Sequence, residues 1–299
     1  MPGFPLSSQT LEFFVVGLAK RLRYSTIKVY LSALKFLNCL YGFDSTTCFS
    51  TRLHYLMRGV RRAQALSLPP RPRRIPISPA HLRLLHDYVD AACPRLDALC
   101  YRAAFNLAFF GMLRVSEFTC PHATVFDPTV HLSRQDVSFA ASRSILHVRI
   151  KQSKTDPFRQ GCIVRVASTG NALCPLTALA LYLQASRQRR GPLFQLGDGS
   201  FLTRAHIQGI LRQTFPLIIP GSINTHSFRI GGATMLCCLG VPDATIQILD
   251  RWSSGAFRQY LRISDQFLSG VHYRAARVCY TRSRVWNPDS GCSLPNYPN

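Results

Sequence analysis

Acidic residues and lysines are both scarce in this chain of 299 residues. It has 14 Asp and Glu residues against 36 Lys and Arg residues, which gives a formal net charge of +22. Only five of the basic residues are lysine; the others are arginine, whose planar guanidinium binds phosphate through two hydrogen bonds. A codon bias toward arginine would explain that ratio equally well. It would not explain the excess positive charge, which indicates a polyanionic partner such as nucleic acid.

Three other features are missing from the sequence. No apolar run approaches the roughly 18 residues of a membrane span, so none is expected. Residues 1–5 lack the basic start and apolar centre of a secretion signal. The 11 cysteines are scattered without a C-x-x-C pair, so we expect reduced, mostly buried thiols of an intracellular protein and no zinc site.

One proline-rich segment divides the chain. Four prolines fall within residues 68–76, interleaved with arginines, and such a segment cannot continue a helix. We therefore predict an N-terminal domain over residues 1–68, a basic linker over 69–77, and a second domain over 78–268. The basic and then Pro/Ser/Asn-rich residues 269–299 are expected to form a terminal helix and a loose tail.

The apolar spacing predicts a mainly α-helical protein with a small antiparallel β-sheet. In the first domain several short helices are expected, one of them capped by Ser25 with Lys28 and Lys35 outside its apolar face. In the second domain Ser78 and Pro79 have the pattern of a helix start. Helices are predicted over residues 26–37, 51–65, 98–113, 175–187, 203–214 and from 225 onward, and a β-hairpin over 144–150 and 162–167.

Four segments carry residue types that suit phosphodiester chemistry. Cleavage without a metal needs cationic donors for the non-bridging oxygens, a nucleophile, and a proton donor for the leaving oxygen. The segments are Gly111–Phe118 with Arg114, Ser116 and Glu117; residues 150–156 with Lys151 and Lys154; residues 225–229 with His226 and Arg229; and residues 249–260 with Trp252 and Tyr260. Arg114 is notable because it follows an apolar segment, where an arginine needs a partner or a ligand.

The order and contexts of these residues resemble those of the tyrosine recombinases, also called phage-type integrases. The resemblance covers roughly residues 6–265 and is strongest for those of eukaryotic mobile elements of the Crypton, DIRS or Ngaro type. It implies an N-terminal helical, SAM-like DNA-clamping domain followed by an α+β catalytic domain. It also implies a double-stranded DNA substrate, a tetrameric synapse in which neighbours exchange the C-terminal helix, a nuclear location, and no cofactor or metal.

The resemblance assigns each residue a role. Arg114 and Arg229 would hold the scissile phosphate, with His226 and Trp252 adding hydrogen bonds and Glu117 orienting Arg114. Tyr260 would be the nucleophile and Lys154 the general acid, although Lys151 remains an alternative by sequence alone. The candidate DNA-binding residues are Lys28, Lys35, Arg71, Arg73 and Arg74.

Two other function classes remain open at this point. The chain could be a catalytically retired integrase retained for DNA binding, or a basic RNA- or chromatin-binding module. Each motif alone also has an ordinary structural interpretation: Arg114 and Glu117 as an i, i+3 ion pair, or His226 as a core histidine. The last function class gives Tyr260 no special role, so a Tyr260→Phe change separates it from the recombinase.

Overall fold

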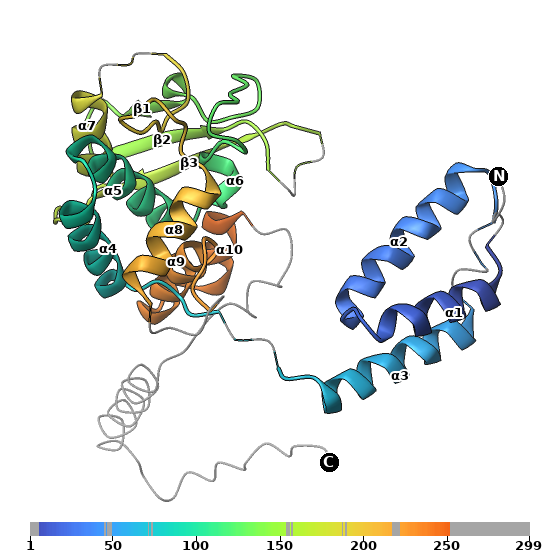
Figure 1. Cartoon of the computed structure of the whole chain (residues 1–299). Helices are drawn as coiled ribbons and strands as arrows, with labels where there is room; N and C mark the ends of the chain where they lie inside the picture. The colour runs from blue at the N-terminus through green and yellow to red at the C-terminus, as the bar shows by residue number, and fades with distance from the viewer. Residues whose placement is uncertain are drawn as a thin grey trace, which may run out of the picture. The chain divides into compact units, whose positions relative to one another are not determined.

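The computed structural model describes residues 6–44, 46, 50–70, 72, 74–153, 156, 158–186, 188, 190–216 and 222–251. It divides into two compact units, Met1–Pro72 and Arg73–Asn299, with the boundary inside the predicted linker (Figure 1). Each unit is described by itself below. No helix in the described part of the chain is long and apolar enough to cross a membrane.

The first unit is built from three helices, α1 (Ser8–Ala19), α2 (Tyr24–Leu40) and α3 (Thr51–Ser67). They are longer than the short helices that the sequence predicted. Their apolar faces meet in a small core centred on Leu11, Val15, Ile27, Leu53 and Met57. Lys28 lies exposed on α2, whereas Lys35 on the same helix is half-buried.

The predicted Ser25 cap is wrong. Helix α2 starts at Tyr24, and its N-cap residue, Arg23, makes no side-chain capping bond. The acceptor comes instead from α3, since Gln64 Oε1 accepts from the backbone N–H of Tyr24 at 2.7 Å. Gln64 Nε2 also donates to the carbonyls of Ala19 and Leu22, so this one side chain ties α3 to the turn between α1 and α2.

The second unit contains most of the core and all the described strands. Its elements are α4 (Pro79–Ala92), α5 (Arg95–Phe110), α6 (Val115–Phe118), η2 (Arg134–Asp136), β1 (Val137–Phe139), β2 (Ile145–Ile150), β3 (Cys162–Ala167), α7 (Pro175–Ala185), α8 (Arg204–Thr214), α9 (Ser227–Cys238) and α10 (Asp243–Asp250). Figure 1 shows the strands at one end of this unit, with α4, α5, α8, α9 and α10 gathered beyond them. Helix α4 begins as predicted, with Ser78 as N-cap and Pro79 in the first turn.

The sheet is three-stranded and antiparallel in the order β1-β2-β3. The predicted hairpin pairs Ile150 with Cys162 and Ile145 with Ala167. Every second residue of β2 is buried, as expected for a sheet with one covered face. Strand β1 was not predicted because three residues are too short to show an alternating pattern. The predicted fold class, mainly α with a small antiparallel sheet, is confirmed.

Close backbone packing places α9 against α5 and the segment before α4. A Cβ on Gly231 would lie 2.0 Å from the carbonyl oxygen of Ile77, and one on Gly232 would lie 2.3 Å from that of Phe109. Ile77 N also donates to Ser227 O at 3.0 Å. Only glycine permits this approach, which brings the start of α9 next to the end of α5.

Helix α5 ends three residues before the predicted limit. It stops at Phe110, because Met112 takes a left-handed backbone with φ 47° and the helix cannot continue through it.

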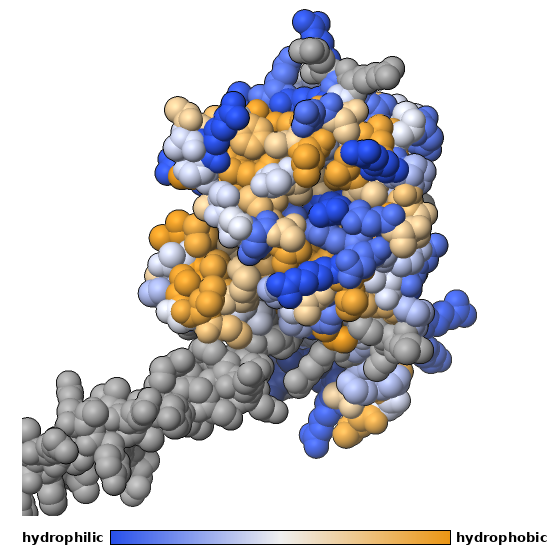
Figure 2. Space-filling model, turned by 90° about the vertical axis from the view of Figure 1, so that its left-hand side faces the viewer, coloured by the Kyte–Doolittle hydropathy of each residue, from blue (hydrophilic) through white to orange (hydrophobic). Residues whose placement is uncertain are grey.

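On the face of the molecule in Figure 2, strongly hydrophilic residues are interspersed with apolar ones.

Candidate active site

The first part of the site is the loop that follows α5. Arg114 is the N-cap residue of α6, and Glu117 lies in the first turn of that helix. Glu117 Oε2 accepts from the Arg114 backbone N–H, and Oε1 accepts from Arg114 Nη1, both at 2.9 Å. Arg114 Nη1 also donates to Ser153 Oγ at 3.2 Å, so the end of the β2–β3 hairpin lies beside it. Arg114 and Glu117 therefore form an i, i+3 ion pair, and the Glu117 side chain is buried.

Arg229 is the most deeply buried charge of the site. Its side chain is 0% exposed, as is that of Asp250, and its Nε lies 2.9 Å from Asp250 Oδ1. Nη1 donates to the carbonyl oxygen of Met112 at 3.0 Å, and Nη2 donates to that of Asp250. Burial lowers the pKa of Arg229 to about 10 and raises the pKa of Asp250 to about 7, although each partner opposes the other's shift.

His226 lies immediately before α9 rather than within it. The sequence predicted a helix from residue 225 onward, but the structure makes His226 the N-cap residue of α9. Asn224 Oδ1 accepts from its backbone N–H at 2.9 Å. Burial, together with the positive charges of Arg74, Arg229 and Arg114, lowers the pKa of His226 to about 4. The imidazole is therefore neutral at pH 7, with one ring nitrogen as donor and the other as acceptor.

Two further charged residues of the site were missed by the sequence analysis. Asp250 ends α10, and Arg251 follows it. Arg251 Nη2 lies 3.0 Å from Glu117 Oε2 and 3.3 Å from Met112 O. The only signal in the sequence was their position directly before Trp252, since adjacent opposite charges are usually solvent-exposed.

Of the two candidate lysines, Lys151 belongs to the residues that the structure describes. Lys151 Nζ lies 2.5 Å from Asp136 Oδ2 and donates to the carbonyls of Pro128 and His131 at 2.7 and 3.0 Å. An ammonium has three protons, and these three acceptors match them. Lys154 lies outside the described residues, as do Trp252, Tyr260, Arg71 and Arg73.

The structure thus brings together Arg114, Glu117, His226 and Arg229 from segments that are far apart in the sequence. Arg74 is exposed on the same unit and close enough to affect the pKa of His226. Lys28 and Lys35 belong to the first unit. Within the described ranges, no group of three or more His, Cys, Asp or Glu residues could hold a metal ion.

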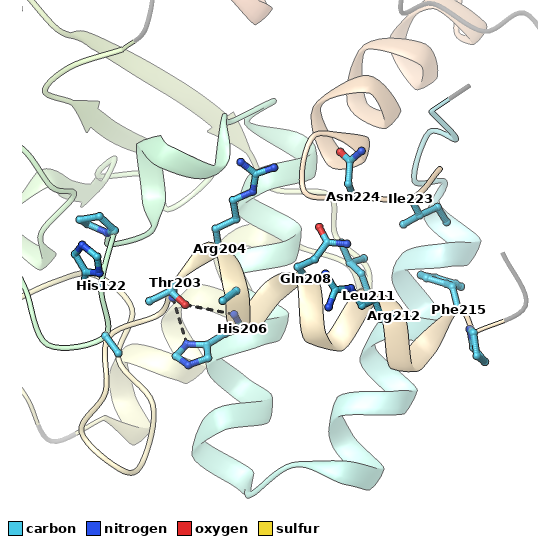
Figure 3. A pocket seen from close by; sticks show the side chains of 14 residues that line it. His122, Thr203, Arg204, His206, Gln208, Leu211, Arg212, Phe215, Ile223 and Asn224 are labelled. Atoms are coloured by element: carbon cyan, nitrogen blue, oxygen red, sulfur yellow. Dashed lines mark hydrogen bonds between the residues drawn. The ribbon is translucent and has the colours of Figure 1, made fainter. Parts of the chain in front are cut away.

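A groove of about 1330 Å³, with both polar and apolar lining residues, lies along α8 and includes Asn224 on the loop before α9. Asn224, whose side chain accepts from the His226 backbone, is one of its lining residues. Figure 3 shows Arg204 and Gln208 pointing from one face of α8, with Asn224 on the loop before α9. The other polar lining residues include His122, His206 and Arg212. Sequence reasoning missed this groove because Arg204 and Arg212 are two arginines among many.

No protein-family model and no curated protein matches the sequence. Solved structures do match. The Tn1549 transposon integrase in complex with transposon right end DNA has a TM-score of 0.59 and 14% identity, over 92% of this chain and 87% of that one. The XerH site-specific recombinase bound to palindromic difH substrate has a TM-score of 0.59 and 16% identity, over 90% and 72%. This chain has the tyrosine recombinase fold.

A lambda integrase dimer bound to a COC′ core site has the same fold, with a TM-score of 0.53 and 14% identity over 86% of this chain and 65% of that one. The tyrosine recombinase fold predicted from the motifs is therefore confirmed. The similarity to eukaryotic mobile elements is a finer prediction that these structures do not test.

Proposed function

We propose that this protein is a DNA recombinase that cleaves and rejoins strands through a 3′-phosphotyrosyl intermediate. The observation that carries the proposal is the charge cluster around Met112. Arg114, Arg229 and Arg251 meet two buried carboxylates there, those of Glu117 and Asp250. Three cations against two anions leave the cluster positive, and a phosphate would balance it.

The proposed reaction uses these groups on one phosphodiester. Arg114 binds one non-bridging oxygen, and Arg229, which is 0% exposed in this structure, would have to give up its contacts with the Met112 and Asp250 carbonyls to bind the other. Neutral His226 and the Trp252 indole N–H add hydrogen bonds as negative charge develops. Tyr260 Oη gives its proton to water and bonds to phosphorus, and the bond from phosphorus to the 5′-oxygen breaks, with its electron pair staying on that oxygen. A lysine donates a proton to that oxygen, which leaves as a 5′-hydroxyl. Attack by a 5′-hydroxyl reverses the step, so the scheme needs neither ATP nor a metal.

Lys154 is the better candidate for the general acid. The ammonium of Lys151 is already engaged with Asp136 and two carbonyls, and it would have to give up these contacts to reach a leaving oxygen. The contact of Arg114 with Ser153 supports the same assignment, because Ser153 is the residue next to Lys154.

The groove beside α8 is where we place the DNA backbone that flanks the cleaved phosphate. Its exposed Arg204 and Arg212 suit phosphate contacts, and the net charge of +22 favours a polyanion. Lys28, Lys35, Arg71, Arg73 and Arg74 would add contacts on the first unit and the linker. We extend the proposal to integration and recombination of a eukaryotic mobile element, in the nucleus, by a tetramer on DNA.

Covalent trapping tests the proposal. The protein is incubated with nicked duplexes that cover the DNA flanking its coding sequence, together with a random-sequence library, and then denatured. A protein–DNA adduct in the wild type and none in Tyr260→Phe is the expected result.

An adduct that survives in Tyr260→Phe would contradict the choice of nucleophile. Tight binding of a duplex without any adduct would contradict the enzymatic proposal and favour a retired, DNA-binding integrase. Failure to bind DNA at all would contradict both.

A further inference from the structure

We infer that Arg251 is a positioning residue, which fixes Glu117 in the orientation that holds Arg114. The inference rests on the proposed function and adds to it a residue that was not among the predicted site residues.

The contacts of Arg251 link the anchors of both phosphate-binding arginines. Glu117 Oε1 binds Arg114 Nη1, while Oε2 takes the Arg114 backbone N–H and Arg251 Nη2. Arg251 Nη2 also donates to Met112 O, the same carbonyl that accepts from Arg229 Nη1. One side chain therefore contacts the carboxylate that orients Arg114 and the carbonyl that orients Arg229.

Glu117 needs this second partner to keep one orientation. Its carboxylate is buried, and each oxygen is directed by a different guanidinium. Without Arg251, Arg114 would be the one partner left to the Glu117 carboxylate among the described residues, and the carboxylate could turn away together with it. Arg114 Nη1 would then lose its fixed direction toward the phosphate.

The backbone of Arg251 gives an independent reason to look for a function. It has φ 58° and ψ 40° at the C-terminal end of α10, a left-handed conformation in which glycine is usual and an L side chain is strained. The arginine side chain is 17% exposed and contacts Glu117, Met112 O and Cys162 Sγ. The contacts, and not the backbone, therefore explain why an arginine suits this position.

This geometry makes Arg251→Gly an informative substitution. It removes the side chain but fits the left-handed backbone, and Glu117 keeps its ion pair with Arg114, so we expect a smaller loss of stability than in Asp250→Ala. Adduct formation on nicked DNA should slow by roughly tenfold to a hundredfold, because Arg114 loses its alignment. DNA affinity should stay within about twofold. Arg251→Lys restores the charge but not the planar guanidinium whose Nη2 contacts both Glu117 and Met112 O, and should recover part of the rate.

Two controls separate positioning from the alternatives. Arg143 also has a left-handed backbone, φ 53°, but it lies exposed in the β1–β2 turn, so Arg143→Gly should leave the adduct rate unchanged. In a Glu117→Gln background, Arg251→Gly should cost much less than in the wild type, because its effect passes through the Glu117 carboxylate.

Each outcome bears on a different claim. If Arg251→Gly slows adduct formation by the same factor in the Glu117→Gln background as in the wild type, then Arg251 contacts the phosphate itself. That result would overturn the positioning role. An unchanged rate in Arg251→Gly, or a rate lost only because the protein unfolds in both Arg251 variants, would overturn it as well. Absence of an adduct in the wild type would instead overturn the proposed function, and the role of Arg251 with it.

Discussion

Met112 is where the charges of the site are organised. Its carbonyl oxygen accepts from Arg229 and Arg251, and its left-handed backbone ends α5 just before Arg114. Each buried cation has an acceptor nearby, which is how a protein tolerates charges that burial would otherwise exclude. Three arginines can therefore be held close together despite their mutual repulsion.

The buried pair of Arg229 and Asp250 gives the first prediction. Asp250→Ala leaves a fully buried arginine without its counter-ion, and the free energy of unfolding should fall by about 3–5 kcal/mol. Asp90 is the matched control, since its ion pair with Arg102 is partly exposed and its removal should cost less than about 1 kcal/mol. Urea denaturation of both variants measures the difference, and equal losses would contradict the buried geometry.

A second prediction concerns pH and His226. The pKa of this side chain is about 4 in the folded protein, against an ordinary value of 6.5. As the pH falls from 6.5 toward 4, the unfolded chain gains a proton at this residue and the folded chain does not, so stability decreases. Relative to a non-titrating His226→Gln variant, the wild type should lose about 2 kcal/mol between pH 7 and 5.

Comparing wild type and variant removes the contribution of Asp250, which titrates in both proteins. Parallel pH profiles of unfolding free energy would show that His226 is not buried among the arginines as the structure places it.

At the scale of elements, the approach of α9 to α5 positions the whole site. Arg229 reaches Met112 O only because Gly231 and Gly232 let the start of α9 lie directly on the backbone of Ile77 and Phe109. A shift of α9 would therefore change the direction of Arg229 and would also move the buried Phe228 and Ile230 on the same helix.

The third prediction tests this packing. Gly232→Ala should lower the free energy of unfolding by about 1–3 kcal/mol or more, because its Cβ would meet the Phe109 carbonyl at 2.3 Å. Gly209 in α8 is the control, since a Cβ there meets nothing within 4 Å and alanine should stabilise the helix by about 0.5–1 kcal/mol. A neutral Gly232→Ala would contradict the close approach of the two backbones.

How far the sequence predicted these elements depended on the range of the interactions. Local patterns predicted the hairpin and the start of α4, because alternation and a Ser-Pro cap are visible within a few residues. The cap of α2 was missed, since Gln64 lies 40 residues from the backbone N–H that it accepts from. Arg251 was missed for the same reason, because its partner Glu117 lies 134 residues away.

At the scale of the whole molecule, positive charge and the groove beside α8 define the expected DNA surface. Arginines that bind phosphates contribute to affinity by releasing counter-ions, so removing one such arginine should reduce the salt dependence of binding. The groove is lined by α8 and by Asn224, which contacts the His226 backbone, so under the proposed function its arginines would bind DNA near the cleaved phosphate.

The fourth prediction follows from that placement. Arg204→Ala and Arg212→Ala should each weaken duplex binding and reduce the slope of log K against log salt by about 1. Arg143→Ala removes an exposed arginine outside the groove and should change neither quantity. Fluorescence anisotropy over a salt series gives the slopes, and an equal effect of all three variants would mean that the groove has no special role.

The central claim is that Tyr260 attacks a phosphate held by the arginine cluster. The most direct measurement is to digest the trapped adduct with protease and nuclease and to sequence the nucleotide-linked peptide by mass spectrometry. The expected product is a nucleotide joined through its 3′-phosphate to Tyr260, with a free 5′-hydroxyl on the other DNA fragment. A link to another residue, or a 5′-phosphate on the protein, would contradict it.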